Sequence, residues 1–220
     1  KLRAISNVSV GFDNIDIKVA TEKKIAVFNT PNILNNTVAD LTMGLIIAVS
    51  RKICEANNYV KKGAWKKNSW PLFLGDDLND ELLGIIGMGN IGKKVAIRAK
   101  SFGLKIKYNN RNRISKEEET KYSAEYYSLK KLLKLCKYIL LLLPLNKQTK
   151  HLINKNTFSV MRKDAYIINV ARGKIIKEED LVEALEKKKI AGAALDVFEF
   201  EPKVHRKLKY MKNTVLMPHA

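Results

Sequence analysis

The sequence contains few cysteines and no apolar run long enough to cross a membrane. Only two of its 220 residues are cysteine, Cys54 and Cys136, and both fall in segments with a helical pattern. Two cysteines do not make a disulfide framework, so the composition indicates a reducing compartment, and we predict a cytoplasmic protein. A membrane span needs about 20 mostly apolar residues. The longest apolar run, residues 138–143, predicts a buried strand, and we predict no membrane partner.

Acidic residues are also scarce. The chain has 22 Asp and Glu against 41 Lys and Arg, which gives a net charge of +19. That balance commonly indicates a nucleic-acid partner or an anionic surface. Here the basic residues are spread along the whole chain, 33 of them are Lys, and 19 Asn accompany them, which fits a coding bias towards A and T as well as a binding surface. Because no zinc-finger spacing, RNP-like aromatic motif or localised basic helix occurs, we predict no nucleic-acid partner and no metal site.

The most informative stretch is residues 81–99, where an apolar run stops in Gly-x-Gly-x-x-Gly and continues with a helical pattern. In such a strand-turn-helix unit Gly87 permits the sharp bend, Gly89 lets the backbone approach a pyrophosphate, and Gly92 lets the helix pack close to the strand. The helix N-terminus presents free N–H groups to the phosphates. Three glycines alone are a weak signal, because any strand-to-helix turn can be rich in glycine, so the context has to decide.

The segment about 20 residues after the glycines helps to identify the cofactor. At this point an NAD-binding unit has an acidic residue that binds the ribose hydroxyls. The predicted strand 104–108 is followed instead by Asn109, Asn110, Arg111, Asn112 and Arg113. A carboxylate would repel a 2′-phosphate, whereas guanidinium groups can bind it in a bidentate manner. We therefore predict NADPH as the preferred cofactor, with NADH possible. The alternative is that Arg111 and Arg113 are two more solvated charges in a basic chain.

Strands and helices alternate along the chain, which predicts an α/β fold: a Rossmann-type, doubly wound parallel sheet. Residues 1–36 read as strand, helix and strand, the C-terminal part of a second, smaller α/β domain, and residues 37–220 as the NAD(P)-binding domain. Both ends look cut, since the chain starts at Lys1 and stops just after a predicted strand. A capping box at residues 37–40 predicts a helix to about residue 62, and the irregular residues 63–80 predict a subunit contact.

Four polar residues follow predicted strands directly: Arg172, Asp196, Glu201 and His219. In an open α/β sheet the carboxyl ends of the strands form the ligand crevice, so these side chains are expected to converge there. At this point the sequence resembles a known family. It contains, in the same order and at nearly the same spacing, motifs that resemble those of the D-isomer-specific 2-hydroxyacid dehydrogenases. These motifs are residues 10–16 (VGFDNID), the Gly87 turn, residues 169–173 (NVARG), residues 194–198 (ALDVF), Glu201-Pro202 and Pro218-His219. Residues 55–65 and 109–113 look most like the glyoxylate/hydroxypyruvate reductase branch.

The resemblance implies a role for each site residue. His219 would be the general acid that protonates the substrate carbonyl oxygen, and Glu201 would hold it. Arg172 would bind the 2-oxo acid together with the backbone N–H groups of Val10 and Gly11. The resemblance also implies a homodimer, and it implies that residues 1–36 are the C-terminal part of a flavodoxin-like substrate domain. The residues expected at the cofactor are Gly87, Gly89, Asn90, Ile91, Gly92, Asn110, Arg111, Arg113, Pro144, Val170 and Asp196.

Simpler interpretations exist for the catalytic residues. His219 could be a structural histidine, Arg172 an ion-pair partner of Glu178 or Glu179, and Glu201 a solvated carboxylate. The sequence also departs from the family pattern at residues 203–206, where further prolines are usual, and at Lys174, where Gly is common. The main hypothesis is an NADPH-dependent reductase of glyoxylate or hydroxypyruvate. The alternatives are a non-catalytic, NAD(H)-sensing binding protein like the corepressors of the same family, or an inactive remnant.

Overall fold

The computed structural model describes residues 1–220 and contains two parallel sheets. The larger has seven strands in the order β5-β4-β3-β6-β7-β8-β9. Its strands are β3 (Leu82–Ile86), β4 (Lys105–Asn109), β5 (Ala124–Tyr126), β6 (Tyr138–Leu141), β7 (Tyr166–Asn169), β8 (Gly192–Leu195) and β9 (Thr214–Leu216). The chain runs outward from β3 through β4 to β5 and then returns to β6 on the other side of β3. The switch point of this doubly wound sheet therefore lies between β3 and β6, where such folds bind ligands.

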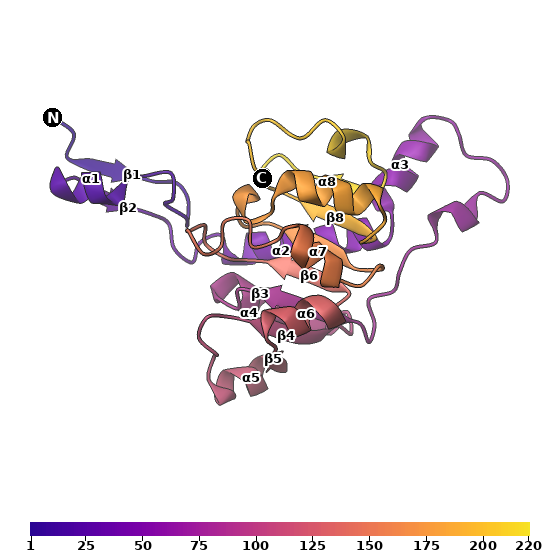
Figure 1. Cartoon of the computed structure of the whole chain (residues 1–220), viewed down its shortest axis with the longest axis horizontal. Coiled ribbons are helices and arrows are strands. Elements are labelled where there is room, and N and C mark those ends of the chain that lie inside the picture. Colours follow the sequence, from indigo (N-terminus) through magenta and orange to yellow (C-terminus); the bar gives the residue numbers. More distant parts are fainter.

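Helices cover both faces of the large sheet (Figure 1). The covering helices are α2 (Asn35–Ser50), α4 (Asn90–Ser101), α5 (Lys116–Tyr122), α6 (Leu129–Leu135), α7 (Lys155–Val160) and α8 (Glu178–Glu186). The short helix α3 (Ile53–Lys61) follows α2 and contains no buried residue, and the chain also has 3₁₀ turns η1 (Trp70–Phe73), η2 (Gly173–Ile175) and η3 (Leu208–Tyr210). Leu140 faces α2 and α4, whereas its neighbours Ile139 and Leu141 face α6, α7 and α8. Central strands buried on both faces explain the unbroken apolar run in this part of the sequence.

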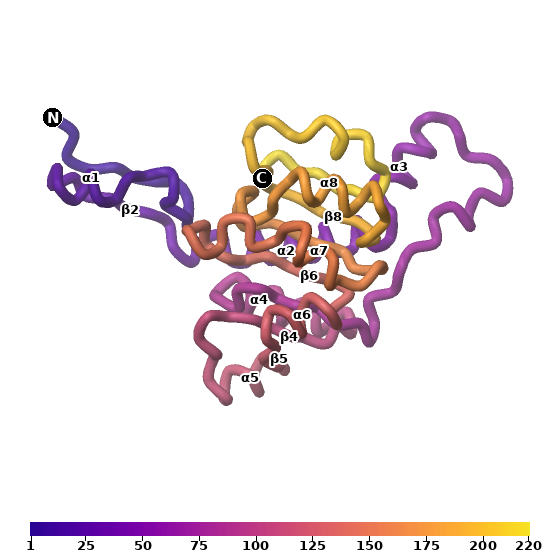
Figure 2. Tube along the Cα trace, viewed as in Figure 1, coloured from indigo at the N-terminus to yellow at the C-terminus, as the bar shows by residue number.

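The small sheet contains β1 (Ala4–Ser6) and β2 (Ala26–Phe28), which pair in parallel with α1 (Ile17–Glu22) between them in the chain. Asp16 caps α1 by accepting a hydrogen bond from the Val19 backbone N–H at 3.0 Å. This lobe stands apart from the seven-stranded body in Figure 1. On the opposite side of the body the chain extends into an arm, residues 63–81, whose path Figure 2 shows most clearly. No helix combines the length and apolar composition needed to cross a bilayer.

The α/β fold class and the parallel sheet are confirmed, but two local predictions were wrong. The helix expected from the capping box begins earlier, at Asn35, without a side-chain cap, and Asp40 instead pairs with Arg98 at 2.5 Å. The predicted single helix to residue 62 breaks at Lys52, whose φ of 53° is left-handed. The charged stretch after Arg113 forms α5, capped by Ser115, and then β5.

Candidate active site

The glycine-rich turn joins β3 to α4 at the switch point of the sheet. Gly87 has a φ of +106°, and a Cβ there would lie 2.5 Å from the Leu142 carbonyl oxygen. A Cβ at Gly92 would lie 2.8 Å from the Gly87 carbonyl oxygen, so this glycine allows the close packing of helix on turn. A Cβ at Gly89 would meet nothing within 4 Å. The three glycines thus have the three separate roles expected of them, and the backbone at Gly89 lies open to a ligand.

The first turn of α4 follows Gly89, and no side chain caps the helix. The N–H groups of Asn90, Ile91 and Gly92 therefore remain available to an anion, in line with their predicted place at the pyrophosphate. The Asn90 side chain points elsewhere and donates to Asn32 Oδ1 at 2.9 Å. These features fit a dinucleotide, because a positive helix end and an unobstructed glycine backbone together form a phosphate cradle.

The loop after β4 lies beside this turn and is attached to it by one side chain. Asn110 Oδ1 accepts a hydrogen bond from the Met88 backbone N–H at 2.6 Å. The Arg111 side chain is exposed and forms no hydrogen bond or ion pair with the rest of the chain. Arg113, by contrast, is held by Glu119: its Nε lies 2.6 Å and its Nη2 2.9 Å from the two carboxylate oxygens. The two predicted arginines are therefore not equivalent.

The Arg113 partner, Glu119, is a buried carboxylate that the sequence did not single out. Its hydrogen bonds to the Arg113 guanidinium lower the pKa of Glu119 to about 2. Burial, together with the hydrogen bond to Glu119, raises the pKa of Tyr108 to about 12. Glu119 is thus ionised in the folded chain, and it stabilises the fold through bonds that require its charge.

This ion pair predicts a specific acid sensitivity. The pKa of Glu119 is lower in the folded state than its ordinary value of 4.5. Its contribution to the free energy of unfolding is therefore present above about pH 4.5 and is lost as the pH falls from there through about 2. We expect Glu119→Gln to lower the free energy of unfolding at pH 7 and to flatten its decline between about pH 4.5 and 2. Urea unfolding at a series of pH values measures this.

The control is Glu22→Gln, which removes an exposed carboxylate that has no partner in the chain. This variant should follow the wild-type pH dependence. If the two variants declined in parallel with wild type below pH 4.5, the stabilising role of the Glu119 charge would be contradicted.

Arg172 lies at the carboxyl end of β7 and bridges the two sheets. Its Nε lies 2.8 Å and 3.1 Å from the two carboxylate oxygens of Asp13, and its Nη1 donates to the Ala171 carbonyl oxygen at 2.8 Å. Its Nη2 lies against Gly11, where a Cβ would come within 1.7 Å of it. The structure therefore brings Arg172 to the Val10-Gly11 segment, as the resemblance implied, and Arg172 does not pair with Glu178 or Glu179.

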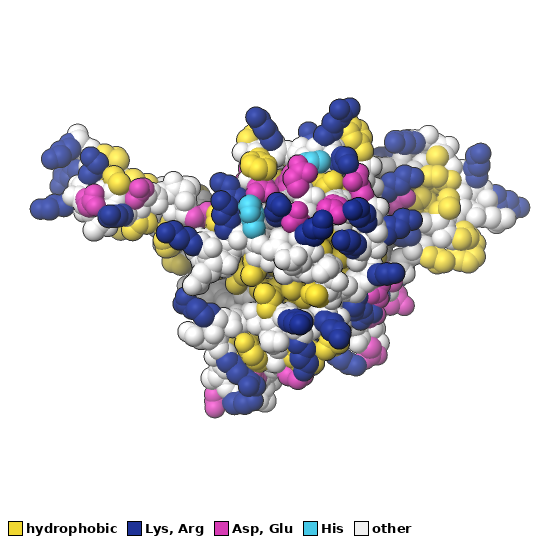
Figure 3. Space-filling view, viewed as in Figure 1, with side chains coloured by type: hydrophobic (Ala, Val, Ile, Leu, Met, Phe, Trp, Pro, Cys, Tyr) yellow, Lys and Arg dark blue, Asp and Glu magenta, His cyan; other side chains and the backbone are white.

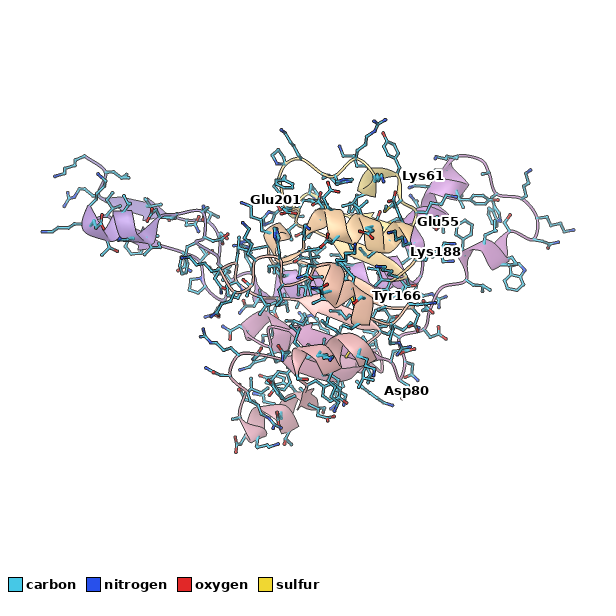
Figure 4. All side chains as sticks on the ribbon, viewed as in Figure 1. Glu55, Lys61, Asp80, Tyr166, Lys188 and Glu201 are labelled. Atoms are coloured by element: carbon cyan, nitrogen blue, oxygen red, sulfur yellow. The ribbon has the colours of Figure 1, made fainter.

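Glu201 and His219 form the second pair of the site. The imidazole Nδ1 lies 2.9 Å from Glu201 Oε2, and Glu201 Oε1 accepts from the Phe198 backbone N–H at 2.9 Å. The His219 side chain is half exposed (50%), which leaves its other nitrogen accessible. In Figure 4 Glu201 lies on the side of the body that faces the small lobe. A carboxylate on one ring nitrogen fixes the orientation of the imidazole and leaves the other nitrogen for a ligand.

The remaining predicted cofactor residues surround the same strand ends. Asp196 is buried, and its Oδ1 accepts a hydrogen bond from the Ala220 backbone N–H at 3.0 Å, which holds the segment that carries His219. Val170 is half-buried and follows β7, whereas Pro144 is exposed and follows β6. Asp196 therefore has a contact that the sequence did not predict.

A cavity of about 840 Å³ lies beside Arg172 and Glu201, and Asp13 also lines it. The loop that carries Glu201 is tied to α8 by two buried carboxylates. Glu178 accepts from the Glu199 backbone N–H at 3.0 Å, and Glu199 accepts from the Glu178 backbone N–H at 2.9 Å. His151 Nε2 lies 2.5 Å from the other oxygen of Glu199. No sequence motif distinguishes Glu199 or His151, so the sequence alone does not indicate that they lie at this site.

These features define a nucleotide-binding α/β protein with a histidine–carboxylate pair and an arginine at its ligand edge. Residues 43–220 match the family model "D-isomer specific 2-hydroxyacid dehydrogenase, NAD binding domain". The chain belongs to this family, which confirms the resemblance and, for the matched domain, a nicotinamide cofactor.

The names of similar proteins agree with membership of this family. The chain is 44% identical to "Glyoxylate reductase" of Thermococcus onnurineus, covering 100% of this chain and 66% of the relative. It is 43% identical to "Glyoxylate/hydroxypyruvate reductase B" of Enterobacter sp., covering 100% and 68%. A solved glyoxylate reductase from Paecilomyes thermophila superposes with a TM-score of 0.91 at 39% identity, covering 99% and 65%. The chain thus spans about two thirds of the length of the curated relatives it matches.

Proposed function

We propose that this protein reduces a small 2-oxo acid, glyoxylate or hydroxypyruvate, to the D-2-hydroxy acid with NADPH as the preferred hydride donor. The observation that carries the proposal is the contact of Arg172 with Gly11 beside the Glu201–His219 pair, at the edge where the glycine turn opens. A cation and a proton donor at one edge suit a reaction in which negative charge develops on a carbonyl oxygen.

Each side chain then has a defined task. Arg172 binds the substrate carboxylate with the Nη2 edge that Asp13 leaves uncovered, and the N–H groups of Val10 and Gly11 assist it. The nicotinamide supplies a hydride to the carbonyl carbon when it is bound. His219 donates a proton to the carbonyl oxygen, and Glu201 holds the imidazole in place.

The preference for NADPH depends on the loop after β4. A free guanidinium at Arg111 is suited to a 2′-phosphate, and no carboxylate follows β4 directly to repel it. NADH remains a possible second donor, because the cradle at Gly89 and the first turn of α4 contact only groups that both cofactors share.

The two parts of the chain have different roles in the proposed enzyme. Residues 1–36 belong to the substrate domain and residues 37–220 to the cofactor domain. A two-stranded sheet such as β1–β2 is too small to be stable alone, which supports its place in a larger domain.

We propose a homodimer in which the arm contacts the partner, since Trp65, Trp70, Leu72 and Leu74 are exposed on it. The cytoplasmic location stays a prediction.

The first experiment measures oxidation of NADPH and NADH with glyoxylate and with hydroxypyruvate. It uses the natural polypeptide, including whatever sequence flanks residues 1–220. We expect NADPH to be preferred, and Arg111→Asp to shift the ratio of kcat/KM values towards NADH by about 10-fold to 100-fold, because a carboxylate repels the 2′-phosphate and accepts from ribose hydroxyls. Arg206→Asp is the control, since Arg206 is an exposed arginine outside this loop.

Two outcomes would contradict the proposal. If Arg111→Asp left the ratio unchanged while the enzyme was active, the assignment of Arg111 would be wrong. If a nucleotide were bound but not oxidised with either 2-oxo acid, a corepressor-like NAD(H) sensor or an inactive remnant would replace the reductase.

A further inference from the structure

The loop that connects β4 to α5 contains a charge network whose role goes beyond the nucleotide site described above. Its centre is the Glu119 carboxylate, whose side chain is only 9% exposed. Three side chains donate to it: the Tyr108 hydroxyl at 2.8 Å, the Arg113 guanidinium through two nitrogens, and Lys116 Nζ at 3.1 Å. The bidentate geometry makes Arg113 the strongest partner of this buried carboxylate.

Arg113 is consequently occupied. Its guanidinium also lies 5.7 Å from the centre of the Tyr126 ring, so the ring and the carboxylate together fix its position. A phosphate that bound the Nε–Nη2 edge of Arg113 would leave Glu119 buried without its main partner, which is strongly unfavourable. The positive charge of Arg113 is already neutralised before any nucleotide arrives.

The same network fixes the loop at both ends. On one side the Ile114 backbone N–H donates to the Tyr108 hydroxyl at 3.2 Å. On the other side Asn110 accepts from the Met88 backbone N–H in the glycine turn. Arg111 lies between these two fixed points, exposed and without a partner in the chain. The loop therefore presents one guanidinium from a rigid frame.

We infer that Glu119 is a specificity-determining residue: it withholds Arg113 from the nucleotide, so that discrimination for a 2′-phosphate depends on Arg111 alone. This inference rests on the proposed function, because it concerns the same nucleotide site. Glu119 acts through Arg113 and contacts no ligand itself, which makes it a positioning residue.

The test is calorimetric titration of the natural polypeptide with NADP⁺ and with NAD⁺ in about 0.15 M salt, where non-specific attraction to the basic chain is screened. The readout is the ratio of the two dissociation constants. Relative to wild type, Arg111→Ala should lower the preference for NADP⁺ by about tenfold or more, and Arg113→Ala by less than about threefold. Glu119→Gln should raise it by about threefold or more, because Arg113 becomes free to bind the phosphate.

The matched control is Glu117→Gln, which removes an exposed carboxylate from the same first turn of α5. It should change the ratio by less than about twofold. If Glu119→Gln does not fold, the comparison of Arg113→Ala with Arg111→Ala decides alone.

The outcomes separate the inference from the proposed function. Equal losses in the two arginine variants, or no rise in a folded Glu119→Gln, would overturn the inference while leaving a nucleotide-binding reductase intact. Failure of the wild-type protein to bind either nucleotide would overturn the proposed function and this inference with it.

Discussion

Replacing His219 with Gln is expected to lower kcat/KM for glyoxylate by about 100-fold to 10,000-fold, the usual contribution of a positioned general acid. Gln preserves part of the shape and can still contact Glu201, but its amide is too weak an acid to transfer a proton to the carbonyl oxygen. The decline in rate at alkaline pH that a protonated acid produces should disappear in this variant. Steady-state kinetics over a pH series measure both effects, and titration with NADPH should show unchanged cofactor affinity.

The matched control is His205→Gln. His205 also lies near a carboxylate, with its Nε2 3.3 Å from Glu179 Oε1, but it belongs to the chain segment before η3 and not to the Glu201–His219 pair. This variant should retain most of the activity. Glu201→Gln should lose less activity than His219→Gln, because the proton donor remains and only its orientation is held less firmly. An active His219→Gln enzyme would remove the proposed acid from the mechanism.

Replacing Arg172 with Ala is expected to raise KM for the 2-oxo acid by about 10-fold to 150-fold, the range for losing hydrogen bonds to a charged group. The loss should be larger than the deleted bonds alone imply, because the Asp13 carboxylate then faces an anionic substrate without its partner. Arg172→Lys should restore little, since an ammonium cannot form the bidentate contacts. Initial rates at varied substrate concentration separate KM from kcat.

A double variant tests the role of Asp13 in this effect. Asp13→Asn combined with Arg172→Ala should have a lower KM than Arg172→Ala alone, because the repelling charge is gone. Gly11→Ala should also weaken substrate binding, as its Cβ would lie 1.7 Å from Arg172 Nη2, whereas Gly44→Ala has open space within 4 Å and serves as control. No recovery in the double variant would show that Asp13 and Arg172 do not act together.

Features that depend on neighbouring residues were predictable from the sequence. Ser128 caps α6 and Asn154 caps α7 by accepting hydrogen bonds from N–H groups two or three residues ahead, the kind of local contact that a sequence pattern can indicate. The glycine turn was equally clear, since its geometry depends on backbone freedom at Gly87 and on local packing at Gly92.

Partner choice was not predictable in the same way. The capping box predicted at Thr37 does not form, because Asp40 pairs instead with Arg98 on α4, 58 residues further along the chain. From the sequence, Arg111 and Arg113 were equivalent candidates for the 2′-phosphate. In the structure the buried carboxylate of Glu119 pairs with Arg113 and not with Arg111. Arg172 lies at the strand edge where the sequence placed it, but its partner Asp13 lies 159 residues away, and the 10–16 motif that contains Asp13 does not indicate this ion pair.

By itself the sequence determined the α/β class, the glycine turn at the end of β3 and the set of polar residues that follow the strands. These follow from hydrophobic period, turn chemistry and the rule that parallel strands end at one edge. Only the tertiary structure decided which charges are free and which are paired: Arg111 open and Arg113 held, Arg172 on Asp13 and His219 on Glu201. The physical reason is that the strength of an ion pair depends on burial and geometry, which are set by elements distant in the chain.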